Sequence, residues 1–152
     1  MKVDMKKSYS LIWCVVFAFA LVTTGCKTKV KPLSERIAKA WTAESVKEGT
    51  VVVYTRGGST NTRPAYSSFR LTLTSPSTVT YTEFDGTTFT GTWALSGDTK
   101  LILSALTPPP TGSGGTLEFT IVSVEDTKLI LKRVTASPKT GNSINEYTLT
   151  NP

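Results

Sequence analysis

The chain has 152 residues, and its 17 lysines and arginines outnumber its 11 aspartates and glutamates, for a net charge of +6. This length suits one domain. The sequence contains no histidine, which excludes the usual zinc sites and the Ser-His-Asp and Cys-His arrangements of nucleophilic catalysis. The basic residues are scattered, without a stripe of interleaved aromatic residues, which argues against a nucleic-acid partner. We therefore expect a non-catalytic protein with no cofactor and no metal site.

The N-terminal segment has the three parts of a secretory signal. Basic residues precede an apolar run at residues 11–22, and the small residue Gly25 stands directly before Cys26. As a helix this run would be only about 18 Å long, which is too short for a bilayer core of about 30 Å. A cysteine at this place resembles the lipobox of bacterial lipoproteins. An ordinary cleaved signal with a chance cysteine is the alternative, because Thr23 stands where a lipobox usually has leucine.

The resemblance implies that residues 1–25 are removed and that acyl chains are attached to Cys26. Two such chains are enough for stable anchoring in a membrane. Residues 26–33 then form a tether, and residues 34–152 form the domain. Lys27 follows the cysteine where inner-membrane lipoproteins carry aspartate. We therefore expect an outer-membrane lipoprotein on the periplasmic face, because the acidic residues that mark surface export are missing as well.

Apolar and polar residues alternate through most of the chain after residue 40, as they do in half-buried antiparallel strands. A short helix capped by Ser34 is expected before them, over residues 34–40. Short gaps with turn residues, such as Asp85-Gly86, join successive runs. The alternating runs cover residues 41–46, 51–56, 68–73, 78–82, 88–95, 100–104, 117–122, 128–132 and 146–150.

Successive strands joined by short turns pair with their neighbours, which makes an up-and-down meander. The sequence therefore predicts an all-β fold, a small antiparallel up-and-down barrel of eight or nine strands with a short N-terminal helix. Closing the sheet removes its two exposed edges. A two-sheet sandwich is the alternative, although most of the gaps are too short for its crossovers.

One hairpin points to a known family. The sequence GTWALSGD at residues 91–98 precedes Leu-Ile-Leu at 101–103, and a short helix runs into Trp41 near the start of the domain. Together with the lipobox and the lysine-rich tether, these features resemble bacterial lipocalin-like lipoproteins over residues 33–150. The resemblance implies a lipocalin-like barrel, and most members of this family have no assigned function.

The resemblance also implies a structural pair. In lipocalins a tryptophan near the first strand packs against an arginine late in the barrel. Trp41 and Arg133 occupy comparable places, and Arg133 lies on the same predicted face as Leu129 and Leu131. An arginine stacked on an indole contributes about 0.5–2 kcal/mol. We expect this pair to plug the base of the barrel, with a structural role.

Four large aromatic residues are predicted to face the interior: Tyr81, Phe89, Trp93 and Phe119. An eight-stranded barrel is just wide enough either to be filled by side chains or to hold one small ligand. These residues would bind a small apolar ligand in the second case. The function predicted is therefore binding of such a ligand or of an envelope component by a membrane-anchored protein. The alternative is a structural or protein-interaction module with a filled barrel, such as an accessory subunit or an inhibitor.

Two polar groups are candidate sites, but ordinary surface is the favoured interpretation of both. Arg56, Arg63 and Tyr66 surround a glycine-rich loop and would suit a carboxylate or phosphate, but solvated loop residues are the simpler interpretation. Glu83 and Asp85 are two residues apart beside a turn. Glycoside hydrolysis uses two carboxyl groups about 5–9 Å apart, yet carboxylates beside a hairpin turn are usually exposed.

A Cys26→Ser substitution in the full chain tests the lipobox. We expect the variant to fold normally but to be uncleaved, soluble or mislocalised, because serine has no thiol for acylation at the lipobox position. Cell fractionation and mass spectrometry of the mature N-terminus measure this. An unchanged outer-membrane fraction would contradict the assignment.

Overall fold

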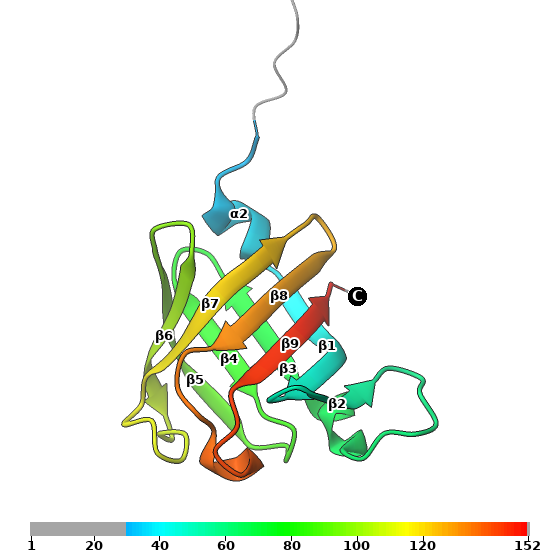
Figure 1. Ribbon diagram of the computed structural model, residues 1–152. Helices are drawn as coiled ribbons and strands as arrows, with labels where there is room; N and C mark the ends of the chain where they lie inside the picture. The colour runs from blue at the N-terminus through cyan, green and yellow to red at the C-terminus, as the bar shows by residue number, and fades with distance from the viewer. Residues whose placement is uncertain (1–29, 152) are drawn as a thin grey trace, which may run out of the picture. The chain divides into compact units, whose positions relative to one another are not determined.

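Nine antiparallel strands form one sheet in the computed structural model, which describes residues 30–151 (Figure 1). A short helix precedes the strands, and two 3-10 turns lie in the loops. Cys26 and the predicted signal segment lie outside the described residues. The elements are α2 (Leu33–Ile37), β1 (Ala40–Glu48), β2 (Val51–Thr55), η1 (Pro64–Ser68), β3 (Arg70–Thr74), β4 (Thr78–Thr82), β5 (Thr88–Ser96), β6 (Lys100–Thr107), β7 (Leu117–Val124), β8 (Lys128–Arg133), η2 (Pro138–Thr140) and β9 (Asn145–Thr150).

The sheet closes on itself because β1 pairs with β3 on one side and with β9 on the other. The ring runs β1-β3-β4-β5-β6-β7-β8-β9, and β9 pairs with β1 in turn. β2 pairs with the second half of β1 and adds a ninth strand beside the ring of eight. The predicted antiparallel barrel with a short N-terminal helix is confirmed, and the β1–β9 ladder excludes the sandwich. Closure removes the free edges that an open sheet would expose.

Side chains on most strands alternate between the interior and the solvent. In β4, Val79 and Tyr81 are buried while the threonines beside them face outward. β3 follows the same pattern with Leu71 and Leu73. Threonine suits the outer positions because its branched side chain packs well on a pleated surface. The period of two that predicted the strands therefore also divides the residues between surface and core.

The two ends of the barrel are closed differently (Figure 1). At the helix end, Ile37 of α2 is fully buried, and the Trp41 indole donates a hydrogen bond to the Ile37 carbonyl oxygen at 2.9 Å. Short turns join the strands at this end. The opposite end, which we call the loop end, carries the longer connections 56–69, 108–116 and 134–144.

The residues Lys31–Pro152 form a compact unit with their own hydrophobic core, which we call the barrel unit. α2 ends earlier than predicted because the chain joins the sheet soon after Ile37: the Lys39 carbonyl oxygen accepts the Leu73 amide at 3.0 Å. The pairing that closes the barrel lies entirely within this unit. We therefore expect the barrel unit to fold without the preceding residues.

A bulge between β5 and β6 requires a glycine. The register shifts between Thr90 and Thr92, and Ala105 on the facing strand adopts a positive φ of 51°. A Cβ atom on Gly91 would lie 2.5 Å from the Ser104 carbonyl oxygen, closer than such atoms approach. Gly91 therefore allows the two backbones to approach at the bulge.

A Gly91→Ala substitution is expected to lower the free energy of unfolding of the barrel unit by about 1–3 kcal/mol, because the backbone must move to admit the methyl group. Urea denaturation measures the change. Thr90→Ser on the exposed face of the same strand is the control and should cost about 0.5 kcal/mol or less. Equal effects of the two substitutions would contradict the close approach.

Candidate functional site

Aromatic rings fill the loop half of the barrel in a continuous chain of contacts. Tyr81 stacks on Phe89 with ring centroids 5.8 Å apart and meets Phe69 edge-on at 5.6 Å. Phe69 stacks on Tyr147 at 4.9 Å, and Tyr147 meets the edge of Phe119 at 6.1 Å. Tyr81, Phe89 and Phe119, three of the four residues predicted to line a cavity, therefore lie in one chain of contacts. Phe69 and Tyr147 complete this chain and were not among the predicted lining residues.

Trp93, the fourth predicted lining residue, lies apart from this chain of rings. Its side chain is buried, and its indole N–H donates to the Thr74 carbonyl oxygen at 2.9 Å. Its backbone N–H donates to the Ser77 carbonyl oxygen at 2.7 Å. These bonds hold Trp93 against the turn between β3 and β4, at the helix end. Trp93 therefore has a structural role there.

The predicted stacking of Arg133 on Trp41 is wrong. Thr42, next to Trp41, pairs with Thr150, which pairs with Lys128 at the start of β8. Arg133 lies at the other end of β8, about 16 Å farther along at roughly 3.3 Å per residue. Both side chains are buried, as predicted, but they occupy opposite ends of the barrel. The alternation of apolar and polar residues predicts which side of the sheet a side chain occupies. It does not predict the position of the residue along the barrel axis.

Lys39 takes the place over Trp41 that was expected for arginine. Its ammonium nitrogen lies 5.7 Å from the centre of the Trp41 ring. The same ammonium donates to the Asp126 carbonyl oxygen in the turn between β7 and β8. A cation therefore still covers the tryptophan at the helix end, but it comes from a residue two positions earlier in the chain.

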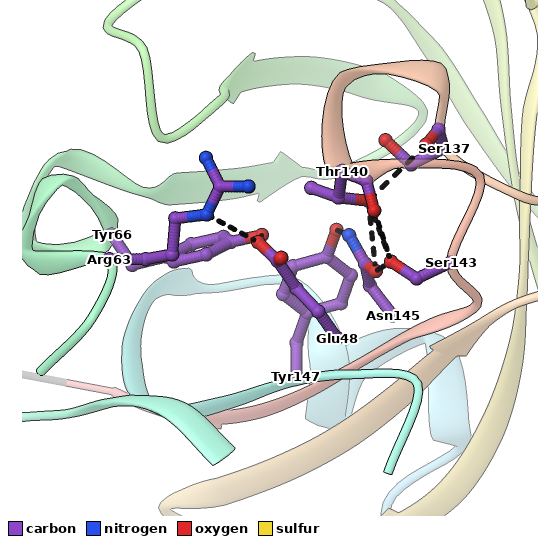
Figure 2. Close-up of polar contacts among 8 residues, drawn as sticks. All are labelled: Glu48, Arg63, Tyr66, Ser137, Thr140, Ser143, Asn145 and Tyr147. Carbon is purple, nitrogen blue, oxygen red and sulfur yellow. Dashed lines mark hydrogen bonds and ion pairs between the residues drawn. The ribbon is translucent and has the colours of Figure 1, made fainter. Parts of the chain in front are cut away.

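Tyr66 closes the loop end from the side (Figure 2). β1 pairs with β3 only near its start, and η1 contacts β1 and β2 beyond that point. The Tyr66 side chain is 1% exposed, and its hydroxyl donates to Glu48 Oε1 at 3.0 Å. Its ring lies 4.9 Å from that of Phe84. Burial, with the Tyr147 hydroxyl and the Glu48 carboxylate nearby, raises the pKa of Tyr66 far above its ordinary value, so it stays a neutral donor.

The interpretation of Arg56, Arg63 and Tyr66 as solvated loop residues is therefore wrong for the tyrosine. Arg63 is half exposed, with its Nε 3.5 Å from Glu48 Oε1 and its guanidinium 5.9 Å from the Phe84 ring. Arg56 donates to the Ala43 carbonyl oxygen at 2.8 Å and so ties its loop to β1. The three residues serve different neighbours and do not form an anion site.

A polar network fastens the 134–144 connection to β9 (Figure 2). The side-chain oxygen of Asn145, Oδ1, accepts from the Ser143 hydroxyl at 2.6 Å and from the Thr140 hydroxyl at 3.2 Å. Its amide group is thereby oriented to donate to the Tyr147 hydroxyl oxygen at 3.3 Å. Burial raises the pKa of Tyr147, although Asn145 and the Arg133 charge oppose the rise. Tyr147 is therefore a neutral phenol at the centre of the loop end.

Glu83 is buried, which contradicts its interpretation as ordinary surface. Its Oε2 lies 2.6 Å from the Lys139 ammonium, which also contacts Asp85 Oδ2 at 2.7 Å. Hydrogen bonds to both carboxylates raise the pKa of Lys139 although burial opposes this. Hydrogen bonds from Lys139 and Thr87 likewise lower the pKa of Asp85 against burial. Both carboxyl groups are thus held by one lysine beside the hairpin turn, an arrangement that favours a structural ion-pair cluster over a glycosidase pair.

No three metal-ligating side chains gather within residues 30–151. No helix in that range is both long and apolar enough to cross a bilayer.

A closed antiparallel barrel with a helix over one end and aromatic and polar side chains at the other has a lipocalin-like fold. A lipocalin-like protein from Bacteroides uniformis is similar in structure, with a TM-score of 0.51 and 14% sequence identity, over 77% of this chain and 99% of that one. An uncharacterized protein from Bacteroides eggerthii is similar over 76% of this chain and 98% of its own, with a TM-score of 0.48 and 13% identity. No family model and no curated protein matches the sequence. At such identities the likeness concerns the fold alone.

A Lys139→Met substitution would leave Glu83 buried without its cation. We expect a loss of about 2–4 kcal/mol in the free energy of unfolding at pH 7, somewhat less than for a fully buried pair because Lys139 is 22% exposed. Since its folded-state pKa is raised above 10.5, the stabilisation is complete from neutral pH up to pH 10.5 and is lost as the pH rises through the folded-state pKa.

Urea denaturation at several pH values measures both effects. Lys100→Met is the matched control, because the Lys100–Glu118 pair is exposed and should contribute about 0.5 kcal/mol or less. A Lys139→Met variant as stable as the control would contradict the buried pair.

Proposed function

We propose that this protein is a lipid-anchored, non-catalytic component of the bacterial envelope that binds a small, mainly apolar ligand at the loop end of its barrel. The observation that carries the proposal is the uneven distribution of buried polar side chains. Among the described residues, Thr42 is the one buried polar residue outside the loop end; the others are Glu83, Arg133, Ser137, Thr140 and Asn145.

Polar groups placed in an apolar core cost free energy unless they are well bonded, so a filled structural barrel gains little from them. A binding site needs them, because a few polar groups orient a ligand that an apolar surface holds. The aromatic chain from Phe89 to Phe119 supplies the apolar surface, and the polar residues stand directly beside it. The loop end therefore combines both requirements of a ligand site.

The ligand enters where the barrel wall depends on side chains. Strand pairing between β1 and β3 is confined to the helix half, and η1 completes the wall beyond it. η1 is held there by the bond from Tyr66 to Glu48 and by the bond from the Arg63 amide to the Val53 carbonyl oxygen at 3.0 Å. Outward movement of η1 would free the volume of the Tyr66 ring without breaking the ring of eight strands.

The lipid anchor is supported by the sequence before residue 26. The lipobox-like Gly25-Cys26 pair and the short apolar run suit a lipoprotein signal. An acyl anchor would hold the barrel unit close to a membrane, where apolar molecules are available.

A structural or protein-interaction module is the second candidate, and the close contacts of the interior rings favour it. In that case the aromatic chain simply fills the barrel, and partners bind the outside. The exposed side chains of Val51 and Val52 on β2 would then belong to a contact surface.

Titration of the barrel unit with N-phenyl-1-naphthylamine, a neutral apolar fluorophore, separates the two candidates. We expect saturable binding of one molecule per barrel. Association should be faster in a Tyr66→Ala variant, because the ring that closes the wall between β1 and β3 is removed. Trp93→Phe, at the helix end, is the control and should bind like the unchanged protein. An absence of saturable binding in both the unchanged protein and Tyr66→Ala would contradict the ligand site and favour the filled module.

A further inference from the structure

The outer surface of β3, β4 and β5, which lie side by side in the barrel wall (Figure 1), carries threonine at most of its solvent-facing positions. We call this surface the threonine face. Its members alternate with buried or half-buried residues along the three strands: Thr72, Thr74, Thr78, Thr80, Thr82, Thr88, Thr90 and Thr92. Arg70, at the edge of the face, is the one ionisable residue at an outward position of these three strands.

The strand register arranges these threonines in rows that cross the sheet. The two central rows are Thr72–Thr80–Thr90 and Thr74–Thr78–Thr92. Neighbouring strands lie about 4.8 Å apart, and every second residue of a strand lies about 6.7 Å farther along it. The hydroxyl groups therefore form a regular, uncharged array on the outside of the barrel.

Strand propensity alone does not account for the threonine face. Threonine is common in strands, but the outward positions of other strands in the same sheet carry ionised side chains. Those of β7, β8 and β9 include Glu118, Lys128, Lys132 and Glu146. Interspersed charges of this kind are typical of a surface that only has to stay in water. The centre of the threonine face has none, although the chain has a net charge of +6.

The central hydroxyl groups of the threonine face are free to bind a partner. Thr82 and Thr88 form a hydrogen bond with each other at 2.9 Å. Within residues 30–151, no hydrogen bond uses the hydroxyl group of Thr78, Thr80 or Thr90. Each of these groups can both donate and accept. Since the branched threonine side chain has few rotamers, holding it in a contact costs little conformational entropy.

The chemistry of the threonine face limits the kind of partner that fits it. A charged partner would meet no opposite charge at its centre, and an apolar partner would bury hydroxyl groups without hydrogen-bond partners, which is costly. Adjacent strands are also rotated by about 20–25° relative to each other, so a rigid flat partner would touch only a few of the threonines. A flexible, neutral chain with hydroxyl groups of its own meets all three conditions.

We propose that the threonine face binds a neutral polysaccharide that lies across β3, β4 and β5. Sugar hydroxyl groups exchange hydrogen bonds with the threonine hydroxyl groups, and the threonine methyl groups contact the C–H groups of the sugar rings. The threonine face is on the outside of the barrel wall, so this binding is independent of the ligand proposed for the loop end.

Affinity electrophoresis of the barrel unit in native gels tests the proposal. Separate gels contain dextran, laminarin or hydroxyethylcellulose, and bovine serum albumin is the reference for sieving. We expect at least one of these neutral polysaccharides to retard the barrel unit relative to a gel without polysaccharide. Retardation by none of the three would overturn the proposal.

A matched pair of substitutions locates the binding. Thr80→Lys places a long charged side chain at the centre of the threonine face and should abolish the retardation. Thr148→Lys adds the same charge at an outward position of β9, where Ile130 and Ser45 are its neighbours across the sheet, and should leave the retardation unchanged. Equal retardation of the two variants would overturn the proposal.

Thr80→Val and Thr90→Val keep the shape of the side chain and remove only the hydroxyl group. Each should raise the dissociation constant for the retarding polysaccharide about two- to tenfold, the range of one neutral hydrogen bond. Urea denaturation checks that all variants are folded, and the valine variants keep the test decisive if Thr80→Lys is not. Unchanged dissociation constants in both valine variants would count against the threonine face.

Sedimentation of the barrel unit without polysaccharide examines a different occupant, a second copy of the chain. We expect a monomer for the unchanged protein and for Thr80→Lys. A dimer that Thr80→Lys dissociates would overturn the polysaccharide proposal and assign the threonine face to self-association.

Discussion

The pairing of β1 with β9 is the constraint on which the rest of the structure depends. This ladder runs from Thr42 to Glu48 and joins the first strand of the chain to the last. It turns a meander of hairpins into a closed ring, so that inward side chains from β3, β4, β5, β7 and β9 reach one interior. Without it the sheet would have two free edges and its apolar face would be open to water.

Closure also explains why the two ends of the barrel differ. β1 pairs along most of its length with β9 but only briefly with β3, and its second half pairs with β2 instead. The wall between β1 and β3 is therefore completed by backbone at the helix end and by the Tyr66 side chain at the loop end. Side chains can leave such a place at far lower cost than a strand can leave a ladder, which supports the proposed entry of a ligand at the loop end.

The strands and the hairpins from β3 to β9 could be predicted because they depend on local patterns, and closure was expected because it removes the exposed edges of the sheet. Alternation identified the strands, and turn residues such as Asp85-Gly86 identified hairpins between neighbours in the chain. The inward faces of Tyr81, Phe89, Trp93 and Phe119 followed from the same period. No local pattern in the sequence predicted that β1 pairs only briefly with β3, or that β2 lies beside the ring as an extra strand.

The polar part of the candidate site could not be predicted, because its contacts join loops far apart in the chain. Glu83 and Lys139 meet from different connections, and each appears ordinary in its own segment. The height of Arg133 depends on the register of three strands, which its spacing from Leu131 does not reveal. Tyr66 lies in a loop of glycine, asparagine and arginine, where burial of an aromatic ring has no periodic signature.

Backbone amide shifts locate a ligand without any substitution, so they test most directly whether binding occurs at the loop end. Two-dimensional NMR spectra of the isotope-labelled barrel unit would be recorded during titration with N-phenyl-1-naphthylamine. We expect the largest shifts in residues 56–69 and 134–147, with the helix-end turns at 97–99 and 125–127 unchanged. Shifts concentrated at the helix end, or spectra that N-phenyl-1-naphthylamine leaves unchanged throughout, would contradict binding at the loop end.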